Sequence, residues 1–221
     1  MGGGFPFDRE IGLGDGSLMQ NLCDRVRKLK ANSFTLVELL VVISIIGLLA
    51  GLATPAIQKG LEKGKQTVDL NNGRQLGLLL FAIANDESLG GGTFPTNGST
   101  STDIFKYLVE NNFLTTLKVL GGNGVPAPTS TNNITAQNIY WAYTKGLAIT
   151  DGNVPLLSTK NSIQTVANTN DVTPSGSSPW KEKGFVIVTA DNSATWYTFT
   201  NGKVSPRWMP CTNAGVSVVQ P

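Results

Sequence analysis

The strongest pattern along the chain is an apolar run from Phe34 to Ile57. Its single charged residue is Glu38, and its other polar side chains are Thr35, Ser44 and Thr54. A helix over these residues would be about 36 Å long, enough to cross a bilayer core of about 30 Å. Since a helix in a soluble core is rarely apolar on all sides, the run predicts a membrane-embedded helix over 34–57.

The same helix is expected to continue in water, as an amphipathic segment over 58–89. Apolar residues recur there at spacings near 3.6, which predicts one buried face, while charged residues, Asp69 included, crowd the first half. The residues of the predicted face are Leu61, Val68, Leu76, Leu79, Leu80 and Ile83. Glycines within the segment weaken an isolated helix by up to about 1 kcal/mol each, so tertiary packing must hold it. We expect the helix to end near Glu87, before the glycines at 90–92.

Residues 90–221 predict a globular head with a short helix and a sheet. Thr102 is placed to cap a helix over Asp103–Asn112, whose inward side is apolar. The inward residues are Ile104, Phe105, Leu108 and Val109. Glycines and prolines predict irregular chain over 113–136, and the polar residues 158–178 predict a long surface loop.

Several short segments of the head have the composition of strands. Asn138–Thr144 is aromatic and β-branched, and Gly184–Thr189 and Thr195–Thr200 frame a hairpin. A tight turn at Asn201-Gly202 leads to a further strand at Lys203–Ser205. An antiparallel meander of these strands could cover the apolar face at 76–83. The predicted fold class is therefore α+β, a long N-terminal helix, membrane-embedded in its first half, packed on a small antiparallel β-sheet head.

The N-terminal residues 1–33 precede the apolar run and divide into two parts. The first eighteen are glycine-rich, whereas the rest carry the basic residues Arg25, Arg27, Lys28 and Lys30. A basic flank favours retention of this end in the cytoplasm, with the head outside. The alternative is a secretory signal peptide, although the apolar run is longer than a signal core. We also hypothesise that translation starts at Met19, which would leave a 15-residue leader.

Composition narrows the possible chemistry. The 221 residues allow one membrane helix and one small domain, and a net charge of +2 without a basic patch gives no support for nucleic-acid binding. The absence of histidine removes Ser-His-Asp and Cys-His catalysis and every histidine metal site. Cys23 and Cys211 flank the apolar run, and they could form a disulfide only if both lay on one side of the membrane.

Two further groups of residues raise the question of a ligand. Asp151, Asp171 and Asp191 stand near asparagine- and glycine-rich turns and could offer oxygen to calcium, but no calcium-loop spacing appears and turn residues are the favoured reading. Trp180, Trp196 and Trp208 could form an exposed binding strip or belong to the core, and core is the favoured reading. We therefore expect no cofactor, with calcium as the open alternative.

The start of the apolar run carries a specific motif. Residues 33–40, Ser-Phe-Thr-Leu-Val-Glu-Leu-Leu, resemble the processing site of type IV pilins and type II secretion pseudopilins. Gly47, Pro55 and Gln58 also stand where many members of this family have Gly, Pro and Gln. Ser33 stands where the family usually has glycine. The resemblance covers roughly residues 25–60.

The resemblance implies a pilin-like fold and a precursor that is cleaved and methylated before assembly. A prepilin peptidase would cut between Ser33 and Phe34 and methylate the new amine of Phe34. Before assembly, the subunit would be stored in the bacterial inner membrane as a single-pass protein with its N-terminus in the cytoplasm and its head outside. It would then polymerise with other pilin or pseudopilin subunits into a cell-surface pilus or a periplasmic pseudopilus. Glu38, Gly47 and Pro55 are the candidate assembly residues.

Glu38 is the one residue whose cost in a membrane needs a physical reason. An acidic side chain at mid-bilayer costs about 2.5–3.5 kcal/mol, and less near the edge, where it could also extend into water. A cut before Phe34 would create an ammonium, and at about 4 Å its attraction to Glu38 would be about 4 kcal/mol at an effective dielectric constant near 20. The pair could form between neighbouring chains or within one chain, one helical turn apart. The intermolecular pair is what the resemblance implies.

The leading interpretation is a structural subunit rather than an enzyme. One rival is an envelope enzyme on an uncleaved signal anchor, which the lack of histidine disfavours. Another is an adhesin or a DNA-uptake minor pilin that uses the same anchor but acts through the head. Persistence of the leader would favour the first rival, and ligand binding by the head would favour the second.

Overall fold

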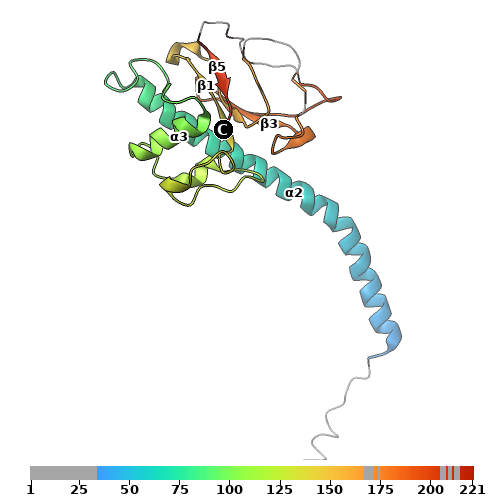
Figure 1. Cartoon of the computed structure of the whole chain (residues 1–221). Helices are drawn as coiled ribbons and strands as arrows, with labels where there is room; N and C mark the ends of the chain where they lie inside the picture. Colours follow the sequence, from blue (N-terminus) through green and yellow to red (C-terminus); the bar gives the residue numbers. More distant parts are fainter. Residues whose placement is uncertain (1–33, 167–171, 174, 205–207, 209–210, 212–214) are drawn as a thin grey trace, which may run out of the picture. The chain divides into compact units, whose positions relative to one another are not determined.

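A computed structural model describes residues 34–166, 172–173, 175–204, 208, 211 and 215–221. The leader 1–33, with Ser33, Cys23 and Met19, lies outside these residues. The chain divides into two compact units, Met1–Pro55 and Ala56–Pro221. The described part of the first unit is the start of the long helix, and the second unit holds the rest of that helix and the head (Figure 1).

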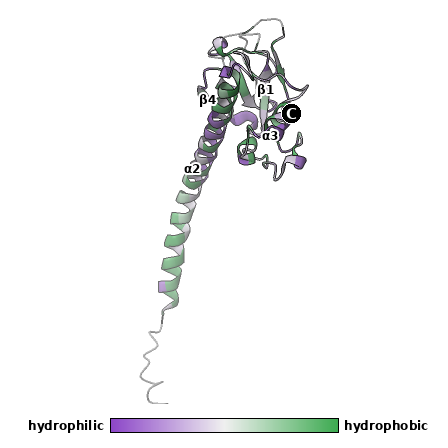
Figure 2. Ribbon diagram, turned by 90° about the vertical axis from the view of Figure 1, so that its left-hand side faces the viewer, coloured by the Kyte–Doolittle hydropathy of each residue, from purple (hydrophilic) through white to green (hydrophobic). Residues whose placement is uncertain are grey.

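The long helix α2 spans Leu36–Asn85 and contains Pro55. It ends two residues before the end predicted at Glu87. Its first part, which belongs to the first unit, is apolar and exposed, and polar residues become frequent only afterwards (Figure 2). By length and composition the helix is able to cross a membrane. The exposed apolar surface agrees with the prediction made from the hydropathy pattern.

The second unit is an α+β head built on the C-terminal half of α2. Its sheet has five antiparallel strands in the order β4-β3-β2-β1-β5. The strands are β1 Trp141–Lys145, β2 Pro155–Thr159, β3 Phe185–Thr189, β4 Ala194–Tyr197 and β5 Ser217–Val219. One further helix, α3 Ser101–Glu110, and the four short 3-10 turns Leu117–Leu120, Thr131–Asn133, Ile149–Asp151 and Lys181–Lys183 complete the described secondary structure. The predicted fold class, a long helix on a small antiparallel sheet, is confirmed.

The face of α2 that packs in the head differs from the predicted one in its first half. Its buried residues are Gln66, Asp69, Gly73, Leu76, Gly77, Leu80, Ile83 and Ala84. Leu61 and Val68, which were expected on this face, are 64% and 52% exposed. The reason is geometric, because eight residues from Val68 to Leu76 advance the helix about 80° past a whole number of turns, whereas seven residues from Asp69 nearly close two turns. Asp69 therefore replaces Val68 on the inner side.

Gly73 and Gly77 explain how the sheet approaches the helix so closely. A Cβ atom at Gly73 would lie 2.7 Å from Cγ2 of Val188 and 2.8 Å from the Trp141 ring, and one at Gly77 would lie 3.0 Å from Cγ1 of Val188. Real Cβ atoms are almost never as close as the two distances at Gly73, and 3.0 Å is tighter than most real contacts, so the side chains of β1 and β3 occupy the space that a larger residue would need. At Gly60 a Cβ would meet nothing within 4 Å. The glycines thus weaken α2 locally but two of them create its contact with the sheet.

The short helix α3 begins earlier than predicted. Its N-cap is Thr100, whose hydroxyl accepts a hydrogen bond from the Asp103 backbone N–H at 3.2 Å, while Asp103 accepts one from the Thr100 backbone at 2.9 Å. The predicted cap, Thr102, lies inside the helix. Thr100 is the N-cap instead of Thr102 because Asp103 stands three residues after it, which allows the reciprocal hydrogen bonds of a capping box. The four apolar residues predicted to face inward are buried.

Three strand predictions are confirmed with shifted ends, and two strands are new. The segments predicted from 138, 184 and 195 correspond to β1, β3 and β4, and β3 pairs with β4 as the expected hairpin. Lys203 and Val204 form only isolated bridges, to Thr200 and Val172, instead of a strand. Ser205 lies outside the described residues. The turn at Asn201-Gly202 is present, with positive φ at both residues.

The central strand β2 was not predicted, because it lies between a predicted turn at 151–153 and the predicted loop at 158–178, and its last two residues fall in that loop. It starts at Pro155 and ends in Ser158 and Thr159, yet all five of its residues are buried. Thr159 compensates for its burial by accepting a hydrogen bond from the Val186 backbone at 3.0 Å. Part of the stretch predicted as a surface loop, 158–178, therefore lies in the core, and Ser162, Ile163 and Val166 are buried there too.

Strand β5 closes the sheet at its other edge. It pairs with β1 from Tyr143↔Val219 to Lys145↔Ser217, more than seventy residues away in the sequence. Gln220 continues the attachment, because its side chain accepts from the Asn161 backbone at 2.8 Å and donates to the Ile163 carbonyl at 2.9 Å. No local pattern in so short a segment predicts this pairing.

Candidate assembly site

The start of α2 is held by a capping box that involves the candidate assembly residue Glu38. The Glu38 carboxylate accepts hydrogen bonds from the Thr35 backbone N–H at 2.9 Å and from the Thr35 hydroxyl at 2.7 Å. The Thr35 hydroxyl accepts in return from the Glu38 backbone N–H at 3.2 Å. Thr35 therefore caps the helix and fixes the Glu38 side chain near its N-terminus.

Sequence reasoning missed this role of Thr35, although the signal was present. Thr35 and Glu38 have the Thr-x-x-Glu spacing that precedes an apolar run in a capping box. Both bonds to the carboxylate end at Oε2, and among the residues that the structure describes Oε1 accepts none. One oxygen of Glu38 thus remains available to a cation, while the other holds the helix end. The positive end of the helix dipole also favours a carboxylate here.

Two other predicted site residues, Gly47 and Pro55, lie on the same exposed part of α2. Phe34, which precedes the helix, is 68% exposed. A Cβ at Gly47 or at Gly51 would meet nothing within 4 Å, so this surface is open to a close neighbour. Pro55 lies within the helix, at the end of the first unit. Ser33 is outside the described residues, so the cleavage site remains a prediction.

A second polar group lies inside the head, around Asp69. This aspartate is 1% exposed. Its Oδ2 accepts hydrogen bonds from the Tyr140 hydroxyl at 2.6 Å and the Trp180 indole N–H at 2.8 Å, and its Oδ1 accepts one from the Asn123 backbone at 3.3 Å. The cluster therefore links α2 to the residue just before β1, to the loop at Asn123 and to the chain before β3. Sequence analysis counted Asp69 among the charged residues in the first half of this segment and did not predict its burial, since nothing in the sequence marks its partners.

The electrostatics of this cluster indicate a structural role. Burial raises the pKa of Asp69 above its ordinary value, against the opposing effect of the hydrogen bonds from Tyr140 and Trp180. Burial and the neighbouring Asp69 raise the pKa of Tyr140 well above its ordinary value. Tyr140 therefore stays a neutral donor. Asp69 thus accepts hydrogen bonds from three donors that come from three separate parts of the head.

The calcium candidates are engaged in their own turns. Asp151 accepts from the Ala148 backbone at 2.7 Å, and Asp191 accepts from the Ser193 backbone at 3.0 Å and from the Thr189 hydroxyl. Asp171 lies outside the described residues. Over the described part of the chain, no group of three or more His, Cys, Asp or Glu side chains is placed to hold a metal ion. Calcium binding stays an untested alternative.

The tryptophans belong to the core and not to an exposed strip. Trp180 and Trp208 are 4% and 5% exposed, and Trp196 is partly buried. The rings of Trp180 and Trp196 meet edge to face with their centres 4.9 Å apart. Cys211 is buried and has no disulfide partner among the described residues. The interpretation of the tryptophans as core residues is confirmed for Trp180 and Trp208.

The comparisons with known proteins concern the N-terminal segment. Residues 28–54 match the family model described as the prokaryotic N-terminal methylation motif. This match bears out the resemblance to type IV pilins and pseudopilins drawn from residues 33–40. It covers the capping box and Gly47, and it stops before the head. Neither the curated proteins nor the solved structures gave a match to the chain.

Proposed function

We propose that the chain is the precursor of a structural subunit of a type IV pilus or a type II secretion pseudopilus. The observation that carries the proposal is the methylation motif at 28–54, followed by one long apolar helix and an α+β head. The motif implies processing by a prepilin peptidase and assembly with other pilin subunits. The apolar helix is consistent with anchoring in a membrane.

In this proposal, the peptide bond between Ser33 and Phe34 is cut and the new amine of Phe34 is methylated. Methylation keeps the positive charge, which remains available to the free oxygen of Glu38. A neighbouring copy can bring its amine to that oxygen while Thr35 keeps the other, so helix capping and pairing do not exclude each other. The exposed apolar side chains around Gly47 then pack against neighbouring helices.

The head supports a structural subunit rather than an enzyme. The buried carboxylate of Asp69 accepts hydrogen bonds from the Tyr140 hydroxyl and the Trp180 indole within the head. The chain has no histidine to serve as a general base. The function therefore depends on the assembly helix, with the head as the surface of the fibre.

Mass spectrometry of the mature chain from membranes tests the proposal. We expect an N-terminus at Phe34 that carries one methyl group. Ser33→Leu should block the cut because a large side chain replaces a small one, whereas Ser33→Gly should preserve it. A purified chain that still begins upstream of Ser33 would contradict the proposal.

A further inference from the structure

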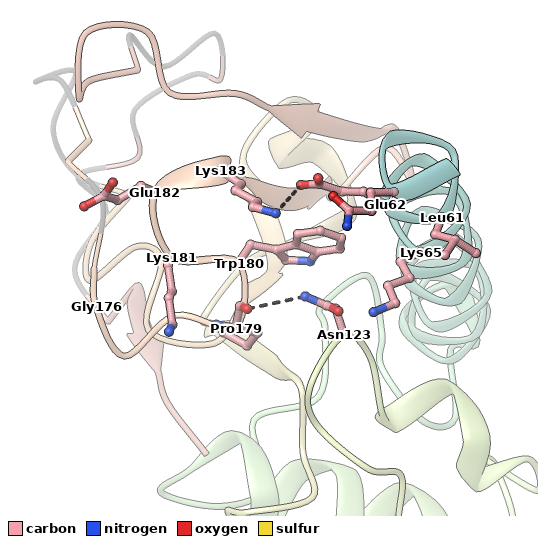
Figure 3. A pocket seen from close by; sticks show the side chains of 11 residues that line it. Leu61, Glu62, Lys65, Asn123, Gly176, Pro179, Trp180, Lys181, Glu182 and Lys183 are labelled. Carbon is pink, nitrogen blue, oxygen red and sulfur yellow. Dashed lines mark hydrogen bonds and ion pairs between the residues drawn. The ribbon is translucent and has the colours of Figure 1, made fainter. Parts of the chain in front are cut away.

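An open cleft with basic side chains lies beside the part of α2 that follows the apolar run. The cleft encloses about 930 Å³, and four residues of α2 between Gln58 and Lys65 line one side of it. The short 3-10 turn Lys181–Lys183 before β3 lines another side. Figure 3 shows three lysines, Lys65, Lys181 and Lys183, around the cleft, and Lys183 pairs with Glu62 at 3.0 Å. Basic residues from two separate parts of the chain therefore meet here.

The cleft and the cavity next to it carry an excess of positive charge. The adjoining cavity shares Glu62, Glu182 and Lys183 with the cleft, and it adds two more lysines of α2. We call the two together the basic cleft surface. Its charged residues are Lys59, Lys63, Lys65, Lys181 and Lys183, with Glu62 and Glu182. Five lysines against two glutamates leave an excess of three positive charges, and among the described residues Lys59 and Lys181 have no ion pair.

The position of these lysines along α2 matches the headgroup layer of a membrane. The apolar run ends at Ile57, so the helix rises only about 3 Å from there to Lys59 and about 12 Å to Lys65. The headgroup region extends about 5–7 Å beyond the apolar core on each side of a bilayer. Because side chains of a helix tilt toward its N-terminus, lysines in this segment reach back toward the apolar run. The ion pair of Lys183 with Glu62 holds the 3-10 turn at the same level.

A lipid surface fits this arrangement better than a soluble anion does. The lysines of the basic cleft surface come from more than one side of α2, and a bilayer surrounds an anchored helix on every side, so all of them can reach it. A soluble anion in the cleft would contact only the lysines that line it. Leu61, which lies between these lysines and is 64% exposed, adds an apolar side chain suited to the boundary between headgroups and acyl chains.

We propose that the basic cleft surface binds the phosphate groups of anionic phospholipids and holds the head against the membrane before assembly. The proposal rests on the proposed function, since only a membrane-anchored chain brings the cleft to the headgroups. Lysines near an anionic membrane surface attract its lipids, and the attraction falls off within the screening length. The contact is therefore made while the subunit is stored in the membrane and is lost when the helix leaves it.

Amine labelling of the full chain in lipid nanodiscs tests the contact. The discs contain either phosphatidylcholine alone or phosphatidylcholine mixed with phosphatidylglycerol, and mass spectrometry measures the acetylation of each lysine. We expect Lys59, Lys181 and Lys183 to be protected in the anionic discs only, whereas Lys106, an exposed lysine of α3, is labelled equally in both. A chain that enters the discs but shows no such protection would overturn the lipid contact alone. A chain that stays soluble without lipid or detergent would overturn the proposed membrane anchoring as well.

A charge-removing variant supplies the second arm of the experiment. Lys181→Gln should lower the enrichment of phosphatidylglycerol among the lipids that co-purify with the full chain about fivefold, because one basic residue near an anionic surface contributes about 1 kcal/mol. Lys106→Gln removes the same charge elsewhere on the head and is the matched control, which should leave the enrichment unchanged. Equal enrichment in both variants would contradict the contact. Protection of Lys181 in neutral discs by inorganic phosphate or a short DNA strand, with none from phosphatidylglycerol, would overturn it in favour of a soluble anion.

Discussion

The two units of this chain hold their polar groups in opposite ways. In the first, Glu38 lies on an exposed apolar helix with one oxygen bonded to Thr35 and the other without a described partner. In the second, Asp69 lies on the same helix further along, is 1% exposed and receives three hydrogen bonds. Among the described residues, the first carboxylate keeps one oxygen without a partner, whereas both oxygens of the second accept hydrogen bonds. In the proposed function, that remaining oxygen of Glu38 receives a partner from a neighbouring chain.

The largest expected effect concerns the charge of Glu38. Glu38→Gln keeps the size and hydrogen-bonding capacity that the capping box needs but removes the charge. If the charge pairs with the Phe34 amine, an attraction of about 4 kcal/mol is lost, and fibre yield should fall at least about tenfold in Glu38→Gln as well as in Glu38→Ala. Membrane insertion, measured by extraction with detergent, should be unchanged. Normal fibre yield from Glu38→Gln would show that the residue only caps the helix.

The second prediction concerns the buried counterpart. Asp69→Ala removes the acceptor of Tyr140 and should lower the free energy of unfolding of the head by about 1–3 kcal/mol. Denaturant titration of the detergent-solubilised full chain measures it, because all four tryptophans lie in the head. Asp69→Asn keeps one acceptor oxygen and should lose less. Cutting and methylation should proceed in both variants, and their loss would contradict the independence of the two units.

Glycine positions on α2 offer a comparison within one helix. Gly73→Ala should destabilise the head by about 1–2 kcal/mol, since a clash with Val188 and Trp141 outweighs the gain in helix propensity. Gly60→Ala, at an open position, should be neutral or stabilise by up to about 1 kcal/mol. The same unfolding titration measures both. Equal effects at the two positions would contradict the close approach of the sheet at Gly73.

The smallest expected effect is a pH dependence of head stability. Burial raises the pKa of Asp69 above its ordinary value of 3.8, so the folded head binds this proton more tightly than the unfolded chain. Asp69 therefore contributes to the free energy of unfolding of the head. This contribution is fully present when the pH lies below the ordinary pKa, and it is lost as the pH rises through the pKa of the folded state. The charged or polar groups facing Asp69 are Tyr140, Trp180, Asn123 and Lys65.

Asp103 should give a pH dependence of stability opposite to that of Asp69, because its pKa is lowered. Hydrogen bonds from Thr100 lower its pKa, so its contribution is lost as the pH falls through the folded value. Unfolding titrations between pH 3 and 7 should therefore show a component that Asp69→Asn removes and an opposite one that Asp103→Asn removes. A pH profile that neither substitution changes would contradict both assignments.

The features that could be predicted from the sequence are those that depend on residues close together along the chain. The apolar helix and the methylation motif depend on adjacent residues, and the confirmed strands β1 and β3 are rich in aromatic and β-branched residues. The capping boxes at Thr35 and Thr100 were legible in the sequence but were overlooked or misplaced by two residues. Strand β2 could not be predicted in this way. Pro155 and Ser158 are typical of loops, and the pairing of β2 with β1 and β3 depends on residues elsewhere in the sequence.

The sequence by itself determined that this protein carries a long apolar helix with one acidic residue at its start, because hydropathy and motif are local properties. Only the tertiary structure decided which side of α2 is buried, that Asp69 rather than Val68 faces the sheet, and that β5 completes it. Those features depend on residues more than fifty positions apart, whose meeting is fixed by packing and by the need to pair every buried polar group.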